Sequence, residues 1–162
     1  MIKKTVEIDV GEILQKRGLV LATAESCTGG MIGERITDVA GSSGYYAGGV
    51  IAYSNAVKVA LLGVGEDVLE KHGAVSAPVA EAMAVGVMER LGADIAVSTT
   101  GIAGPSGGSE QKPVGLVFIG LAVKDGFSTV QECRFEGNRT KVRMAASQAA
   151  LEMIQHYLNS CR

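Results

Sequence analysis

The sequence predicts an α/β fold: a three-layer α/β/α domain with a mixed, mostly central sheet. Two observations favour this class. Short apolar runs of strand length alternate along the chain with longer segments of helical periodicity. Two glycine-rich loops each follow a strand-like run, where open α/β sheets usually bind their ligands. At 162 residues the chain has single-domain size, and we expect one domain over residues 1–162.

Periodicity and turn residues predict the elements in chain order. The expected helices cover 1–17, a segment after Gly30 to about residue 39, 54–62, 66–72, 76–91 and about 139–158. The expected strands cover 19–24, 49–53, 94–100, and 114–123 with 127–135 as a hairpin through 124–126. Strands that alternate with helices, followed by one hairpin, indicate a mixed sheet.

Caps and buried faces follow from the same pattern. We expect Ser54 and Ser76 to cap the helices that they precede. Helix 76–91 should bury a stripe of Val79, Met83, Val87 and Leu91. The last helix should turn inward Val142, Ala146, Ala149, Met153 and Tyr157.

Charge and cysteine content argue against several classes of function. The net charge is −2 and no basic block is present, so we expect no nucleic-acid partner. No apolar run reaches membrane-spanning length and no signal peptide is visible, which favours the cytoplasm and no membrane partner. Cys27, Cys133 and Cys161 are widely spaced, and only His72 and His156 could join them, so no metal site is expected.

Ser26 is the first candidate for chemistry. The turn from Ser26 to Gly30 is expected to end at a helix start, where free backbone N–H groups favour an anion. Such a position can bind a phosphate or stabilise the oxyanion of a carbonyl that Ser26 attacks. A plain serine N-cap explains the segment as well. The segment is neither a P-loop nor the elbow of serine hydrolases, because Ala24 and Thr28 stand at the flanking positions.

A serine nucleophile needs a base, and Lys58 is the better candidate. It lies in the first turn of the helix behind Ser54, where the helix dipole and burial both lower a lysine pKa. Ser–Lys pairs are a known form of nucleophilic catalysis. An exposed lysine on a short helix is the alternative. His72 and His156 have the pattern of surface residues, and Tyr53 could relay a proton or simply pack.

A glycine-rich loop over 101–109 could surround a ligand with its N–H groups. Thr100, at the root of this loop, is placed to donate a hydroxyl hydrogen bond. Arg139, at the start of the last helix, could reach an anionic ligand. A long surface turn and a solvated arginine are the alternatives.

Several motifs together resemble the CinA C-terminal domain family. They are Thr23-Ala24-Glu25-Ser26-Cys27-Thr28-Gly29-Gly30, Asp38-Val39-Ala40-Gly41-Ser42-Ser43, Tyr53-Ser54-Asn55-Ala56-Val57-Lys58, His72-Gly73-Ala74-Val75-Ser76, Gly101-Ile102-Ala103-Gly104-Pro105, Lys112-Pro113-Val114-Gly115 and Gly137-Asn138-Arg139. The resemblance covers nearly the whole chain from about residue 5. It implies hydrolysis of the carboxamide of nicotinamide mononucleotide to nicotinic acid mononucleotide and ammonia. It also implies a Ser–Lys mechanism with no metal or cofactor.

The resemblance also implies roles for individual residues. Ser26 would be the nucleophile and Lys58 its base, with Tyr53 and Thr100 assisting. The residues that would contact the substrate are Glu25, Thr28, Gly29, Gly30, Asn55, Gly101, Gly104 and Arg139. Among these, Glu25 is the candidate neighbour of the pyridinium cation, and Arg139 or a helix start would take the phosphate. We expect a small pyridine nucleotide as the partner and a homo-oligomeric assembly.

Two other functions stay open. One is a cysteine amidase that uses Cys27, whose pKa would fall at a helix start, although no histidine partner is evident. The other is a non-catalytic nucleotide-binding or regulatory domain with the same pocket. Loss of Ser26 or Lys58 would be its signature, and both residues are present.

Overall fold

The computed structural model describes residues 4–161. Its elements are α1 (Val6–Arg17), β1 (Leu21–Glu25), α2 (Met31–Thr37), the 3₁₀ turn η1 (Ser42–Gly44), β2 (Tyr46–Ile51), α3 (Asn55–Leu62), α4 (Glu66–His72), α5 (Ala77–Leu91), β3 (Ile95–Gly101), β4 (Leu116–Val123), β5 (Ser128–Arg134) and α6 (Arg139–Ser160). Every predicted helix and strand is present, with shifts at several ends. Within the described residues, none of the helices combines the length and the hydropathy that crossing a bilayer requires.

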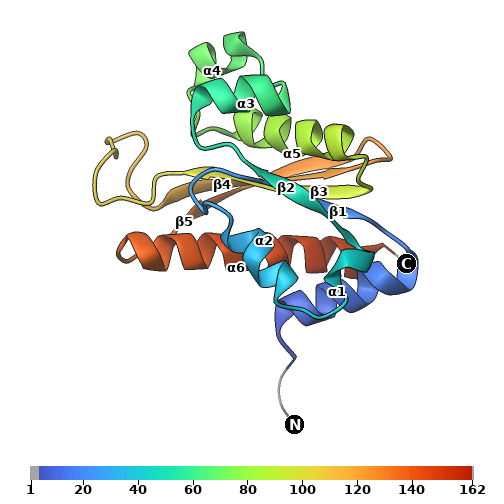
Figure 1. The fold of residues 1–162 in the computed structure, drawn as a ribbon. Coiled ribbons are helices and arrows are strands. Elements are labelled where there is room, and N and C mark those ends of the chain that lie inside the picture. The colour runs from blue at the N-terminus through green and yellow to red at the C-terminus, as the bar shows by residue number, and fades with distance from the viewer. Residues whose placement is uncertain (1–3, 162) are drawn as a thin grey trace.

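The strands form one open sheet in the order β2-β1-β3-β4-β5. Strand β1 is parallel to β2 and β3, while β4 runs antiparallel between β3 and β5. Helix α5, with α3 and α4 behind it, covers one face of the sheet, and α1, α2 and α6 cover the other (Figure 1). The predicted class, a mixed α/β sheet with helices on both faces, is therefore confirmed.

The strand order decides where a site can form. The two neighbours of β1 are β2 and β3, which lie on opposite sides of it. The chain therefore turns one way after β1, to reach β2, and the opposite way after β2, to reach β3. Parallel strands end at the same edge, and the gap between diverging connections is where such sheets bind ligands. The segments that begin at Ser26, at Ala52 and at Ile102 all leave the sheet at this edge.

The two faces of the sheet pack differently. The face under α6 carries large side chains such as Leu21, Ile95 and Leu121, whereas the face under α5 is rich in alanine. Small residues let the second layer approach closely. The contact between α5 and α3 is tighter still, because a Cβ on Gly86 would lie 1.9 Å from the carbonyl oxygen of Leu62. Helix α3 is therefore pressed against α5 at a point that admits only glycine.

Some predicted details are wrong. Strand β2 begins at Tyr46 and ends at Ile51, earlier than predicted. Its glycines obscured it, and Gly49 is needed there because a Cβ would lie 2.2 Å from Oγ1 of Thr23. Leu91 ends α5 and is 38% exposed, and the hydroxyl of Ser76 donates to the carbonyl of Gly73 instead of capping.

The buried face of α6 also differs from the prediction. Val142 and Ala146 are buried as expected, but the row continues through Ala150, Ile154 and Leu158. The predicted Ala149, Met153 and Tyr157 are only partly buried and line a cavity beside β5. The reason is that α6 packs over β3 and β4, so that β5 stays less covered.

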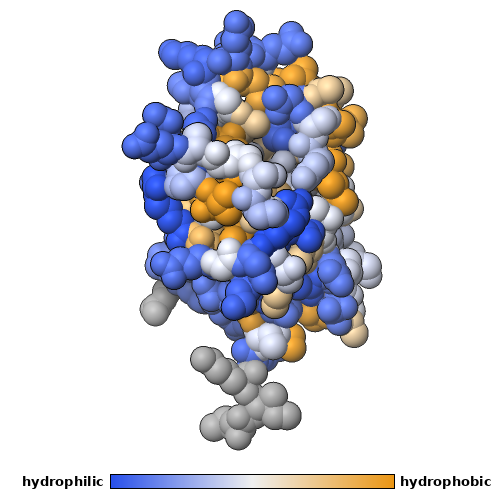
Figure 2. All heavy atoms as spheres, turned by 90° about the vertical axis from the view of Figure 1, so that its left-hand side faces the viewer, coloured by the Kyte–Doolittle hydropathy of each residue, from blue (hydrophilic) through white to orange (hydrophobic). Residues whose placement is uncertain are grey.

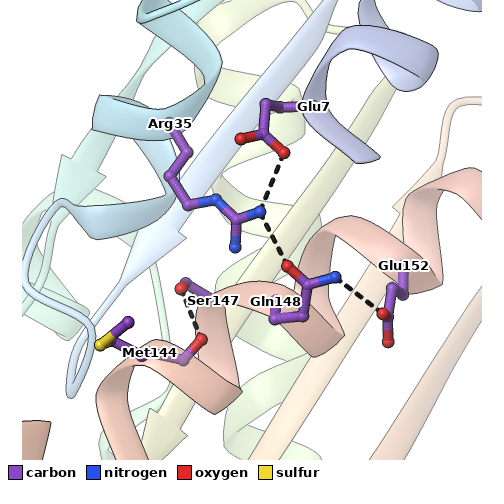
Figure 3. Close-up of polar contacts among 6 residues, drawn as sticks. All are labelled: Glu7, Arg35, Met144, Ser147, Gln148 and Glu152. Atoms are coloured by element: carbon purple, nitrogen blue, oxygen red, sulfur yellow. Dashed lines mark hydrogen bonds and ion pairs between the residues drawn. The ribbon is translucent and has the colours of Figure 1, made fainter. Parts of the chain in front are cut away.

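A polar network joins the three helices on this face (Figure 3). Arg35 of α2 donates from one nitrogen to Glu7 of α1, at 2.9 Å, and to Gln148 of α6, at 2.8 Å. Gln148 in turn donates to Glu152. Burial raises the pKa of Glu7, but the hydrogen bond and charge of Arg35, together with hydrogen bonds from the backbone and from Thr5, outweigh burial and hold the pKa below its usual value. The network fixes α1 and α2 against α6.

Candidate active site

A pocket of about 270 Å³ opens at the edge where β1, β2 and β3 end. Its lining residues are Ser26, Cys27, Tyr53, Asn55, Lys58, Ala74, Val75, Thr100, Gly101, Ile102, Ala103, Gly104, Ser106, Gly107 and Arg139. Figure 2 views the molecule from the side on which the loop between β3 and β4 projects, and apolar residues appear there in patches between hydrophilic ones. A larger cavity of about 810 Å³, between β5 and α6, lacks the predicted nucleophile and base.

Ser26 and Lys58 meet inside this pocket. The Nζ of Lys58 lies 3.0 Å from Oγ of Ser26, although the two residues come from different elements. Ser26 directly follows β1, and its N–H donates to the carbonyl of Thr99 on the neighbouring strand. Lys58 stands in the first turn of α3, whose start is capped by the hydroxyl of Ser54 as predicted. The strand end and the helix cap thus set the distance between them.

The surroundings of Lys58 favour the neutral amine. The side chain is 1% exposed, and no acidic side chain within residues 4–161 forms an ion pair with it. Burial lowers its pKa. Besides Ser26, Nζ contacts the carbonyl oxygens of Ala52 at 2.8 Å and Tyr53 at 3.2 Å. Carbonyls accept only, so they use the two N–H bonds of a neutral amine and leave its lone pair for the Ser26 hydroxyl.

Glu25 is placed differently from the expectation. Its carboxylate is buried and accepts hydrogen bonds from the backbone N–H groups of Gly30, Ile32 and Gly33 at 2.9–3.2 Å. It also accepts from Oγ1 of Thr28 at 2.7 Å. The start of α2, at Met31, is thus capped by the chain's own carboxylate. Glu25 does not line the pocket, and the helix start is not open to a ligand.

The backbone N–H groups that the turn after Ser26 leaves free for a ligand are therefore not the predicted ones. Thr28, Gly29 and Gly30 do not line the pocket. The N–H of Gly29 donates to the carbonyl of Ser26, and that of Gly30 to Glu25. In the part of the chain that the structure describes, the N–H groups of Cys27 and Thr28 have no hydrogen-bond acceptor. Of these two residues, Cys27 lines the pocket, so its N–H is the candidate oxyanion donor.

The outer rim brings together Tyr53, Arg139 and the glycine-rich loop. Arg139 donates to the carbonyl of Gly104 at 2.8 Å and to the hydroxyl of Tyr53 at 3.3 Å. The predicted Asn55 and Gly101 line the same pocket. Thr100 lines it too, but its hydroxyl donates to the carbonyl of Ala74 at 2.8 Å. Towards a ligand, Thr100 can therefore accept but not donate, contrary to the expectation.

The alternative nucleophile and bases are less suitably placed. Burial raises the pKa of the Cys27 thiol to about 11, because the effect of desolvation exceeds that of its polar neighbours. A thiol with this pKa is protonated at neutral pH and is a poor nucleophile. His72 is exposed at the end of α4 and does not line the pocket. His156 lines the separate cavity beside β5.

Residues 3–158 match the family model of the CinA C-terminal domain. The chain belongs to this family. The resemblance that its motifs indicate is therefore confirmed. A CinA-like protein of Chlorobaculum tepidum is 54% identical over 151 residues, which are 91% of this chain and 36% of that protein. One of Microcystis aeruginosa is 54% identical over 156 residues, 95% of this chain and 37% of the relative. The chain thus spans little more than a third of these curated relatives.

Solved structures of the CinA family share the fold. The competence/damage inducible protein CihA of Agrobacterium tumefaciens superposes with a TM-score of 0.91 at 41% identity, over 98% of both chains. The competence damage-inducible protein A of Klebsiella pneumoniae gives a TM-score of 0.93 at 32% identity, over 97% of both. The names of these four proteins state no reaction, so chemistry has to be argued from the site.

One residue of this CinA domain escaped the sequence analysis. Arg143 of α6 donates from Nε to the carbonyl of Cys27 at 3.0 Å and from Nη2 to that of Thr28 at 3.1 Å. A signal was available, because Arg139 and Arg143 are four residues apart and so lie on one face of the helix. Only Arg139 belongs to one of the motifs that carry the family resemblance, so the sequence predicted no role for Arg143.

Proposed function

We propose that this chain is a nicotinamide-nucleotide amidase, which hydrolyses the carboxamide of nicotinamide mononucleotide to the carboxylate and ammonia. The observation that carries the proposal is the contact of a buried lysine, which has no ion-pair partner among residues 4–161, with the hydroxyl of Ser26 at 3.0 Å. Acyl transfer needs such a nucleophile and base, and amide hydrolysis is acyl transfer to water. The choice of substrate rests on what the resemblance to the CinA C-terminal domain family implies, and the charge at the pocket mouth supports it.

The reaction has two halves. In the first, neutral Lys58 takes the proton of Ser26 while Oγ attacks the amide carbon. The N–H of Cys27 donates to the oxyanion that forms. Protonated Lys58 then gives this proton to the leaving nitrogen, the C–N bond breaks, and ammonia departs from an ester on Ser26. In the second half, Lys58 takes one proton from water as the water oxygen attacks the ester, and gives it to Oγ of Ser26 as the ester C–O bond breaks. The carboxylic acid formed then releases its proton to solvent and leaves as the carboxylate.

Carbonyls hold Lys58 for both transfers. The oxygens of Ala52 and Tyr53 keep Nζ beside Ser26 whether the amine is neutral or protonated. A protonated Lys58 would have three donors for these two carbonyls and for Oγ. Lys58 can therefore carry the proton between the two transfers. Among the described residues no carboxylate pairs with Lys58, so the protonated form is not stabilised by an ion pair.

The rest of the nucleotide suits the rim. Arg139 carries the positive charge at the pocket mouth, beside the loop from Gly101 to Gly107. The guanidinium forms charge-assisted hydrogen bonds with phosphate oxygens. We therefore place the amide at Ser26 and the phosphate at Arg139. The pyridinium ring then lies between them, near the exposed ring of Tyr53, which can stack on a cation.

Turnover of nicotinamide mononucleotide by purified protein tests the proposal. Wild type should release ammonia, while Ser26→Ala and Lys58→Met should lose roughly 10³-fold or more in kcat and still bind the nucleotide. Cys27→Ala should keep wild-type activity, since the thiol is protonated and buried. Activity that survives in Ser26→Ala and disappears in Cys27→Ala would overturn the Ser–Lys assignment.

The same measurement separates the remaining candidate, a non-catalytic nucleotide-binding domain. Such a domain would bind the nucleotide in a calorimeter but release no ammonia from it. In such a domain Lys58→Met would change the affinity for the nucleotide and nothing else, because there would be no turnover to lose. The buried lysine favours catalysis, because a pocket that only binds an anion gains little from a cation buried with its charge suppressed.

A further inference from the structure

Arg143 lies beside the nucleophile without lining the pocket. It stands in the second turn of α6 and reaches the turn after Ser26 with two nitrogens. Gly29 packs directly against it, because a Cβ there would lie 3.1 Å from Nη2. Among residues 4–161, Arg143 forms no salt bridge. Its charge is therefore directed at backbone carbonyls and is not neutralised by a carboxylate.

The hydrogen bonds of the turn show what this contact does. The carbonyl of Ser26 accepts from the N–H of Gly29, and that of Thr28 accepts from Met31 as well as from Arg143. Among the described residues, the carbonyl of Cys27 accepts from Arg143 alone. Without the arginine, this carbonyl of a buried residue would have no donor in the part of the chain that the structure describes.

The direction of a carbonyl sets the direction of the next N–H. The peptide bond between Cys27 and Thr28 is trans, so its C=O and N–H point in opposite directions. Arg143 holds the C=O toward α6, and the N–H of Thr28 is thereby turned away from α6. Rotation of this peptide would take the Cys27 carbonyl off Arg143, and a carbonyl oxygen turned to the side of the Cys27 N–H would repel an oxyanion bound there.

We propose that Arg143 is a positioning residue for acyl transfer: it orients the peptide between Cys27 and Thr28 and keeps carbonyl oxygens away from the developing oxyanion. This inference rests on the proposed amidase function. The guanidinium also adds an unneutralised positive charge next to the turn, which favours the anionic intermediate over the neutral amide. Both effects act on the transition state more than on substrate binding.

The test compares Arg143→Gln and Arg143→Lys with a matched control. Arg143→Gln should lower kcat about 10- to 100-fold with little change in KM, as expected when transition-state stabilisation alone is removed. Arg143→Lys should recover only part of kcat, because an ammonium lacks the planar fork that reaches two carbonyls. Arg35→Gln also removes a half-buried arginine, one that bridges helices away from Ser26, and should lower the thermal midpoint but leave kcat unchanged.

A second readout does not depend on the amide substrate. A fluorophosphonate probe phosphonylates an activated serine through a transition state with a developing oxyanion, so its rate should fall in the Arg143 variants in parallel with kcat. Wild-type kcat and labelling rate in folded Arg143→Gln would overturn the inference. So would an equal loss in Arg35→Gln, which would indicate general loosening. If wild type is labelled but releases no ammonia, the proposed substrate fails while the labelling rates still decide the role of Arg143.

Discussion

At the scale of single residues, Lys58 is the unusual feature. Burying an ammonium without a counter-charge is costly, and proteins commonly avoid the cost by shifting the pKa toward the neutral form. Two backbone carbonyls and one hydroxyl are the only partners that the described residues offer to Nζ. These partners suit an amine that changes its protonation state during a reaction. A lysine with a purely structural role would gain more from a carboxylate.

The pH dependence of catalysis follows from this lysine. Its pKa in the folded protein lies below the ordinary value of 10.5, and in the proposed mechanism the neutral form is the base. We expect kcat/KM to rise with pH and to level off above the lowered pKa, below pH 10.5. A profile measured from about pH 6 to 10 at constant ionic strength checks this. A flat profile over the whole range, with chemistry rate-limiting, would contradict Lys58 as the base.

Sequence reasoning found part of the site. Ser26, Lys58, Tyr53 and Arg139 stand in recognisable motifs, and all four line one pocket. Their roles stay predictions. The partners of Glu25 could not be predicted, because they depend on where α2 begins. Arg143 was missed for a similar reason, since its two carbonyl acceptors are 116 and 115 residues away along the chain.

At the scale of elements, the start of α2 is the most informative. Helix starts leave N–H groups unpaired, and side chains or ligands must satisfy them. Here Glu25 does so from the last position of β1, directly before the nucleophile. One residue therefore ends a strand, caps the next helix and determines the width of the turn between them.

Glu25→Gln should destabilise the protein. The carboxylate accepts from three backbone N–H groups and one hydroxyl, and an amide has only one accepting oxygen for them. We expect a loss of about 2–4 kcal/mol in the free energy of unfolding, measured by urea denaturation. Glu34→Gln, an exposed change in the same helix, is the control. Equal stability of the two variants would mean that the buried cap contributes nothing.

Element bounds were predictable where capping residues are clear. Helix α4 has the predicted limits, Glu66 and His72, because a glycine flanks it on each side. Strand β2 was misplaced because its glycines are poor strand formers in isolation. Gly49 is needed for its packing against Thr23, and Gly48 for a positive φ of 136°. Tertiary contact outweighed local propensity there, and a single sequence does not contain that information.

At the scale of the whole molecule, the layers are held by different forces. The α5 face relies on close packing of small side chains, and the opposite face on large apolar residues together with the network around Arg35. This network links the first helix to the last. Because Glu7 and Arg35 form a half-buried ion pair in it, the strength of the network should depend on pH in the acid range.

Acid should weaken this link through Glu7. Its folded pKa is lowered from 4.5, so the stability it contributes is fully present above 4.5 and is lost as pH falls through the folded pKa. Wild type should therefore be more stable than Glu7→Gln at neutral pH, and the difference in unfolding free energy should shrink as pH falls from 4.5 through the lowered pKa. Urea denaturation of both proteins at several pH values measures it. A difference independent of pH would contradict the assignment to the carboxylate.

The contact of Gly86 with Leu62 has a consequence for the tolerance of the enzyme to change. Leu62 is the last residue of α3, the helix that carries Lys58. A side chain at position 86 would therefore displace α3 away from α5 and move Lys58 with it. A displacement of about 1 Å can reduce a rate about 100-fold, since proton transfer needs the two atoms in contact. The proposed Ser26–Lys58 pair is thus vulnerable to a substitution in α5, a helix that contributes no side chain to it. Such a variant would keep both side chains and still lose the proposed activity, and a comparison of the pocket residues alone would not detect the defect.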